Sequence, residues 1–103
     1  MFVMTDYAYQ RLRGAKAIIT EALTTAQKFE LANITCIWDD GREIADSPAH
    51  ILVISSGATS VRGSFTDEEL ADFPGKVGTE STKQKLHAML YSLSKDQDFN
   101  ERI

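Results

Sequence analysis

Apolar residues recur at helical spacing through the first third of the chain. They lie three, four or one residues apart, at Ala8, Leu12, Ala15, Ile19, Ala22, Leu23 and Ala26. A helix of about 3.6 residues per turn brings these positions onto one face. Thr5 is a suitable N-cap, so the pattern predicts a helix between about residues 5 and 30. Gly14 interrupts it at a cost of about 1 kcal/mol relative to alanine, which indicates either a weak point or close approach of a neighbouring backbone.

The most apolar run of the chain lies at its middle. Residues 51–54 are Ile, Leu, Val and Ile, and three of the four are β-branched. Such a short run predicts a central strand that is buried on both faces. Residues 55–58 are small and include a glycine, so we expect a turn there and an antiparallel return over residues 59–65. The packed face of this return strand is predicted to carry Thr59, Val61, Gly63 and Phe65.

A first hairpin is predicted before the central strand. Ile34, Cys36 and Trp38 alternate with other residues, as in a strand with one packed face. The sequence Asp-Asp-Gly at 39–41 is a strong turn signal. Arg42–Ala45 is then expected to form a short return strand, which would be the fourth strand of the sheet.

Two capping boxes mark the expected starts of later helices. Thr66 with Glu69 predicts a short helix, which the Pro-Gly pair at 74–75 ends. Ser81 with Gln84 predicts a final helix of about 14 residues. The apolar stripe of that helix is Leu86, Met89, Leu90 and Leu93. Residues 98–103 are charged, and we expect this tail to fray.

These elements predict an α+β fold for a single small domain that covers residues 1–103. Its core is a three- to four-stranded antiparallel β-meander, with the long N-terminal helix and the C-terminal helix packed on one face, in the order α-β-β-β-β-α-α. A chain of 103 residues with 43% hydrophobic residues is long enough for one core. The sequence shows neither the ~20 apolar residues of a membrane span nor the features of a signal peptide, so we expect a cytoplasmic protein that does not bind membranes.

Catalytic chemistry has few candidates. Cys36 is the only thiol, and His50 and His87 are the only imidazoles. A cysteine nucleophile needs an exposed thiol with an imidazole beside it, whereas Cys36 lies on the packed face of a predicted strand. Nucleophile-elbow, P-loop and dinucleotide motifs do not occur. We therefore predict no catalytic residue, no cofactor and no metal, the alternative being a small enzyme or ligand-binding protein with a site between helices and sheet near Cys36.

Acidic residues gather in two places. One group surrounds the turn at Asp39 and Asp40, and the other opens the short helix, with Glu68, Glu69 and Asp72. Clustered carboxylates can bind Ca²⁺, but the spacing after Asp39 does not fit an EF-hand loop, which favours a solvated turn. The net charge of −4 is uneven, because residues 1–28 sum to +2 and residues 29–103 to −6.

This charge distribution predicts the class of partner. An acidic surface disfavours binding to nucleic acid and attracts a protein with a basic surface. Exposed tyrosines are good interface anchors. We therefore predict a small non-enzymatic protein-binding module whose partner-binding residues are Asp39, Asp40, Glu68, Glu69, Asp72, Tyr7 and Tyr9. An edge strand also offers a route to a homodimer by sheet extension.

In being small, acidic and without a site motif, the chain resembles the accessory proteins of phages and other mobile elements, including anti-CRISPR inhibitors. The resemblance is one of size and charge. It implies a role as an inhibitor or adaptor.

Overall fold

The helices and strands follow the predicted order closely. The structure, a computed structural model, describes residues 6–44, 47–73, 75 and 79–102, and the side chains among them from residue 8 to residue 95. The elements are α1 (Asp6–Lys28), β1 (Ile34–Trp38), the 3₁₀ turn η1 (Asp39–Gly41), β2 (Ala49–Ser56), β3 (Thr59–Thr66), α2 (Asp67–Asp72) and α3 (Thr79–Arg102). The predicted α+β class is confirmed. The predicted N-cap Thr5 lies outside the described residues.

The sheet is an antiparallel meander of three strands in the order β1-β2-β3. The central strand β2 pairs with both neighbours, and Cys36 and Val61 flank Ile54 in the register. The predicted hairpin partner of β1 is wrong, because residues 42–44 form no strand and β1 pairs with β2 instead. The physical reason is the turn: residues 39–41 all have positive φ, so they form a left-handed 3₁₀ turn that leads the chain out of the sheet.

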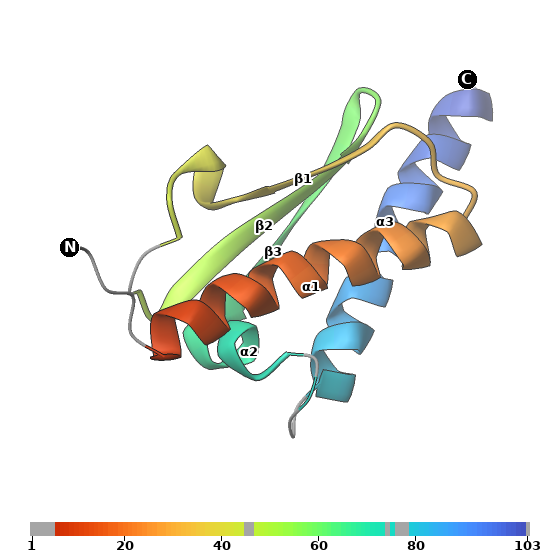
Figure 1. Ribbon diagram of the computed structural model, residues 1–103. Coiled ribbons are helices and arrows are strands. Elements are labelled where there is room, and N and C mark those ends of the chain that lie inside the picture. Colours follow the sequence, from red (N-terminus) through yellow and green to blue (C-terminus); the bar gives the residue numbers. More distant parts are fainter. Residues whose placement is uncertain (1–5, 45–46, 74, 76–78, 103) are drawn as a thin grey trace.

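All three helices lie on one side of the sheet (Figure 1). Their buried side chains meet those of the strands in one core, made of Ala15, Ile18, Ala22, Ala26, Trp38, Leu52, Ile54, Phe65, Leu70, Phe73, Leu86, Met89, Leu90 and Leu93. The predicted stripe of α1 is correct at Ala15, Ala22 and Ala26. It is wrong at Leu23, which is 42% exposed, because the helix turns Ile18 toward the core instead.

Only one face of the central strand is covered. Leu52 and Ile54 are fully buried beneath the helices, whereas Ile51 and Val53 are half-buried on the opposite face. The prediction of burial on both faces is therefore wrong, because none of the described helices packs on the second face. The alternation predicted for β3 is confirmed, since Phe65 is buried and Arg62 is exposed.

Two glycines allow helices to pack closely. A Cβ atom at Gly14 would lie 1.5 Å from the carbonyl oxygen of Leu70, so the backbones of α1 and α2 touch there. Of the two alternatives that the sequence left open at Gly14, the structure shows the close approach of a neighbouring backbone. A Cβ atom at Gly63 would lie 2.5 Å from Sδ of Met89, which shows that α3 crosses directly over β3.

A buried tryptophan joins α1 to the sheet. The indole Nε1 of Trp38 donates a hydrogen bond to the carbonyl oxygen of Ala15 at 3.1 Å. The Trp38 ring also meets Phe65 edge to face, with 5.5 Å between ring centroids. Its one polar atom is thus satisfied inside the core, which removes the cost of burying it.

Helix α3 is longer than the sequence predicts. It begins at Thr79 rather than at the predicted cap Ser81, and it extends for 24 residues. Its predicted apolar stripe is confirmed, because Leu86, Met89, Leu90 and Leu93 are all buried. Fraying of residues 98–103 stays a prediction. Among the described residues, helices that are long and apolar enough to cross a membrane are absent.

Candidate functional site

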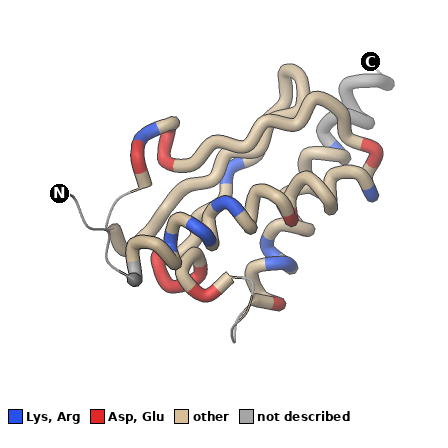
Figure 2. The backbone as a smooth tube through the Cα atoms, in the orientation of Figure 1, with Lys and Arg blue, Asp and Glu red and all other residues tan. Residues whose placement is uncertain are grey.

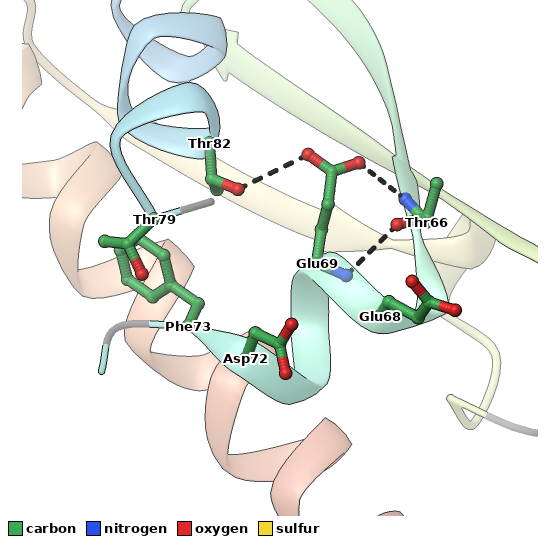
Figure 3. Close-up of a pocket in the computed structure, with 7 residues that line it drawn as sticks. All are labelled: Thr66, Glu68, Glu69, Asp72, Phe73, Thr79 and Thr82. Carbon is green, nitrogen blue, oxygen red and sulfur yellow. Dashed lines mark hydrogen bonds between the residues drawn. The ribbon is translucent and has the colours of Figure 1, made fainter. Parts of the chain in front are cut away.

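Three of the predicted partner-binding residues line one small pocket (Figure 3). The pocket has a volume of about 170 Å³ and lies between α2 and the start of α3. Its lining residues are Thr66, Glu68, Glu69, Asp72, Phe73, Thr79 and Thr82. We call it the acidic pocket.

Glu69 is held inside the fold by a dense set of hydrogen bonds. It forms the predicted capping box with Thr66, whose hydroxyl accepts from Glu69 N–H at 3.1 Å and whose own N–H donates to Oε1 at 2.9 Å. The Thr82 hydroxyl and the Lys85 ammonium donate to the same carboxylate (Figure 3 draws the Thr82 bond). Burial alone raises the pKa of Glu69, but these donors more than offset it and hold the pKa below its usual value.

The other two carboxylates of the acidic pocket are available to solvent. Glu68 is exposed and Asp72 is partly exposed. Both carboxylates lie apart from that of Glu69, although all three residues come from α2 (Figure 3). The described part of the chain contains no group of three or more His, Cys, Asp or Glu side chains that could hold a metal ion. The pocket therefore presents separate negative charges rather than a chelating group.

A buried ion network lies at the start of β2. The His50 ring is fully buried, and its Nδ1 lies 2.8 Å from Oδ2 of Asp39 while its Nε2 lies 2.8 Å from Oδ1 of Asp67. The pKa of Asp67 is lowered, so its carboxylate is ionised and accepts a hydrogen bond from Nε2 of His50. Arg11 donates to the Asp67 carboxylate as well, with 3.1 Å between Nη2 and Oδ2. We call Arg11, Asp39, His50 and Asp67 the ion network.

Each carboxylate of the ion network has more than one partner. Arg11 and His50 both bind Asp67, and the second oxygen of Asp39 accepts from Ile51 N–H at 2.8 Å while the first faces His50. Burial raises the pKa of Asp67, but the guanidinium of Arg11 and the ring of His50 outweigh it and bring the pKa below its usual value. Paired in this way, the buried charges avoid the large penalty of isolated ones.

The geometry of the ion network ties three segments of the fold together. Both ring nitrogens of His50 are occupied by carboxylates, and the ring is shielded from solvent. The sequence analysis did not identify the partners of His50. The available signal was its parity in the strand, because His50, Leu52 and Ile54 share one face.

Cys36 has no geometry that would activate it. The thiol is half-buried, and burial raises its pKa, so less thiolate is present at neutral pH. His87 is exposed on α3 and its ring packs against Phe29, with 5.0 Å between centroids. Cys36 does not line the acidic pocket. The alternative of an enzyme or ligand-binding site near Cys36 stays a prediction.

The remaining predicted residues differ in their availability. Asp40 is exposed beside the ion network. Tyr9 is 57% exposed, and the guanidinium of Arg13 lies 5.8 Å from its ring centroid. The side chain of Tyr7 lies outside the described residues. The acidic positions of η1 and α2 lie at the end of the molecule where α1 begins (Figure 2).

One face of the sheet is uncovered, as expected from the predicted packing of helices on the other face, but its extension over the central strand β2 was not predicted. The uncovered face consists of Thr35, Ile37, Ile51, Val53, Ser55, Ser60, Arg62 and Ser64, and we call it the open sheet face. Ile37 is 41% exposed there. A groove of about 280 Å³ continues this face at one end, and its lining residues are Asp39, Asp40, Arg42, Glu43, Ser47, Ala49 and Ile51.

Comparison with known proteins gives no relative of this chain. No family model matches its sequence, and neither a curated protein nor a solved structure is similar to it at a significant level.

Proposed function

We propose that this protein is a small non-enzymatic binding module that acts by surface contact with a protein partner, as an inhibitor or adaptor in the cytoplasm. The observation that carries the proposal is a division among its carboxylates. Asp39, Asp67 and Glu69 are paired within the fold. Asp40, Glu68 and Asp72 have no hydrogen bond or ion pair within the described part of the chain, so their charges are free to meet another molecule.

The free carboxylates belong to one end of the molecule. The His50 ring bonds to both Asp39 and Asp67, so their sequence neighbours Asp40 and Glu68 are held near one another. Figure 2 shows both acidic segments at the end of the molecule where α1 begins, on either side of the start of β2. A concentration of negative charge steers a basic partner toward that end and repels the phosphates of nucleic acid.

The partner is therefore a protein with a basic surface. Charges at the rim of an interface change the rate of association and its salt dependence more than the final affinity. Capture of the partner should accordingly weaken as salt is added. The half-buried thiol of Cys36, with its raised pKa, supports binding over catalysis.

The test is capture of partners from a lysate of the source cells, followed by mass spectrometry. The variant carries Asp40→Lys and Glu68→Lys. The matched control carries Glu30→Lys and Glu80→Lys, which change the charge equally and again combine a residue of positive φ with an acidic residue in the first turn of a helix. We expect the first pair to abolish a salt-sensitive capture that the control retains. Equal capture by both variants would contradict the proposal.

A further inference from the structure

The open sheet face has the composition of a small interface. Ile37 and Val53 are direct cross-strand partners, and Ile51 lies two residues along β2 on the same face. Hydroxyl side chains surround them, from Thr35, Ser55, Ser60 and Ser64. An apolar centre within a polar rim is the usual arrangement of a protein–protein contact.

The charges of the open sheet face are placed on opposite sides of its apolar centre. Arg62 lies on β3 directly beside Val53, is exposed, and has no ion-pair partner among the described residues. The groove lies across the sheet from it, after the end of β1, and its exposed charges are Asp40, Arg42 and Glu43, which sum to −1. Ala49 and Ile51 form the floor of the groove, so it continues the face toward its acidic side.

We propose that the open sheet face binds a second copy of this chain, so that two sheets pack face to face in a symmetric dimer. A two-fold axis in the plane of the contact, passing near Ile51 and Val53 and diagonal to the strands, places Arg62 of each copy over the groove of the other. The same pair of charges then forms twice, as an isologous interface requires. The strands of the two sheets cross at a large angle, which is one of the two known modes of sheet packing.

This charge arrangement favours a second copy over an unrelated protein. A single face that carries a cation on one side and an acidic groove on the other is complementary to itself. Of the free carboxylates, Asp40 lines the groove and belongs to both contacts, whereas Glu68 and Asp72 of α2 are not involved in the dimer and stay open to the partner proposed above. The inference thus goes beyond that function and can fail independently of it.

The size of the face predicts a weak dimer. Strands spaced about 4.8 Å apart, with about 3.4 Å of rise per residue, give three strands of up to eight residues a footprint on the order of 400 Å². This is roughly half of the area that each partner buries in a standard interface. We therefore expect a dissociation constant of about 10–100 µM, in reversible exchange with monomer.

Sedimentation velocity between about 5 and 500 µM tests the proposal. We expect Ile37→Glu and Arg62→Glu each to weaken the dimer at least about tenfold, because each places an unpaired charge in the contact. Leu23→Glu on α1 is the control for Ile37, since its exposed fraction is 42% against 41%. Lys28→Glu is the control for Arg62. Circular dichroism verifies that all four variants are folded.

A charge exchange provides the sharper measurement. Adding Glu43→Arg to Arg62→Glu restores the pair in reversed order, so the double variant should recover most of the lost association. A protein that stays monomeric over the whole range would overturn the proposal, and so would a dimer that Ile37→Glu and Arg62→Glu leave intact, which would indicate pairing through an edge strand. The proposal would also be overturned if the protein were a monomer and Ile37→Glu abolished its capture of another protein. That result would assign the open sheet face to that other protein.

Discussion

His50 donates a hydrogen bond to the Asp67 carboxylate across 2.8 Å in the interior of the protein, and so ties the first turn of α2 to the start of β2. The opposite nitrogen of the ring holds Asp39 and with it the turn after β1. One side chain thus fixes three segments that are separate in sequence. The removal of the ring leaves two carboxylates that have lost a hydrogen-bonding partner.

We expect His50→Phe to lower the free energy of unfolding by roughly 2–4 kcal/mol, because a shielded carboxylate without its partner costs more than the pair gains. Urea unfolding followed by circular dichroism measures the change. His87→Phe is the matched control. His87 is exposed, and the substituted phenylalanine keeps an aromatic ring against Phe29. Similar losses in the two variants would show that the ion network contributes little.

Stability should decrease in acid. The pKa values of Asp67 and Glu69 are lower in the folded chain than their usual values. At a pH between the folded and the unfolded pKa values, the unfolded chain therefore binds more protons than the folded chain. The stabilisation is complete above the unfolded pKa values of about 4 and is lost as pH falls through the folded ones. We expect the midpoint of urea unfolding to fall steadily below about pH 5. Glu69→Gln should flatten this dependence, and Glu80→Gln, at an exposed position, should leave it unchanged.

The contact between α1 and α2 makes Gly14 irreplaceable. Alanine favours a helix by about 1 kcal/mol over glycine, but its Cβ atom would overlap the carbonyl oxygen of Leu70. We expect Gly14→Ala to destabilise the protein by about 2–3 kcal/mol through separation of the two helices. Gly75→Ala is the control, because nothing lies within 4 Å of its added atom. A gain in stability from Gly14→Ala would contradict this packing.

The Cys36 thiol should react slowly. Burial raises its pKa, so we expect modification by a thiol-specific disulfide reagent at pH 7.5 to be at least about tenfold slower in the folded protein than in urea. The release of the coloured leaving group gives the rate directly. Fast reaction in the native state would instead favour the alternative of a site near Cys36.

Local features of the fold were predictable from the sequence, whereas features that join distant segments were not. The capping box needs only Thr66 and Glu69, which are three residues apart, and it was predicted correctly. The bond between Arg11 and Asp67 joins residues that are 56 positions apart, so neither residue indicates the other. The same limit applies to burial. The apolar run at residues 51–54 identifies a strand, but the number of covered faces depends on where the helices pack.

The candidate surface shows the same division. Asp40 and Glu68 were predicted to be accessible and are exposed. Asp39 and Glu69 belong to the same acidic clusters but are bound within the fold, because a side chain from another element, His50 or Lys85, contacts each of them. Charge clustering in the sequence therefore indicates where acidic residues gather and does not separate the free carboxylates from the paired ones.

Because the helices cover only one face of the sheet, alternate residues of the same strand lie in different environments. In β2, the even positions from His50 to Ile54 build the interior, while Ile51 and Val53 face outward and contribute little to it. Substitutions at the outward positions can therefore accumulate without damage to the core. Among homologues of this protein, we expect variation to rise and fall with every second residue of the sheet, and the outward set to change together with whatever it contacts.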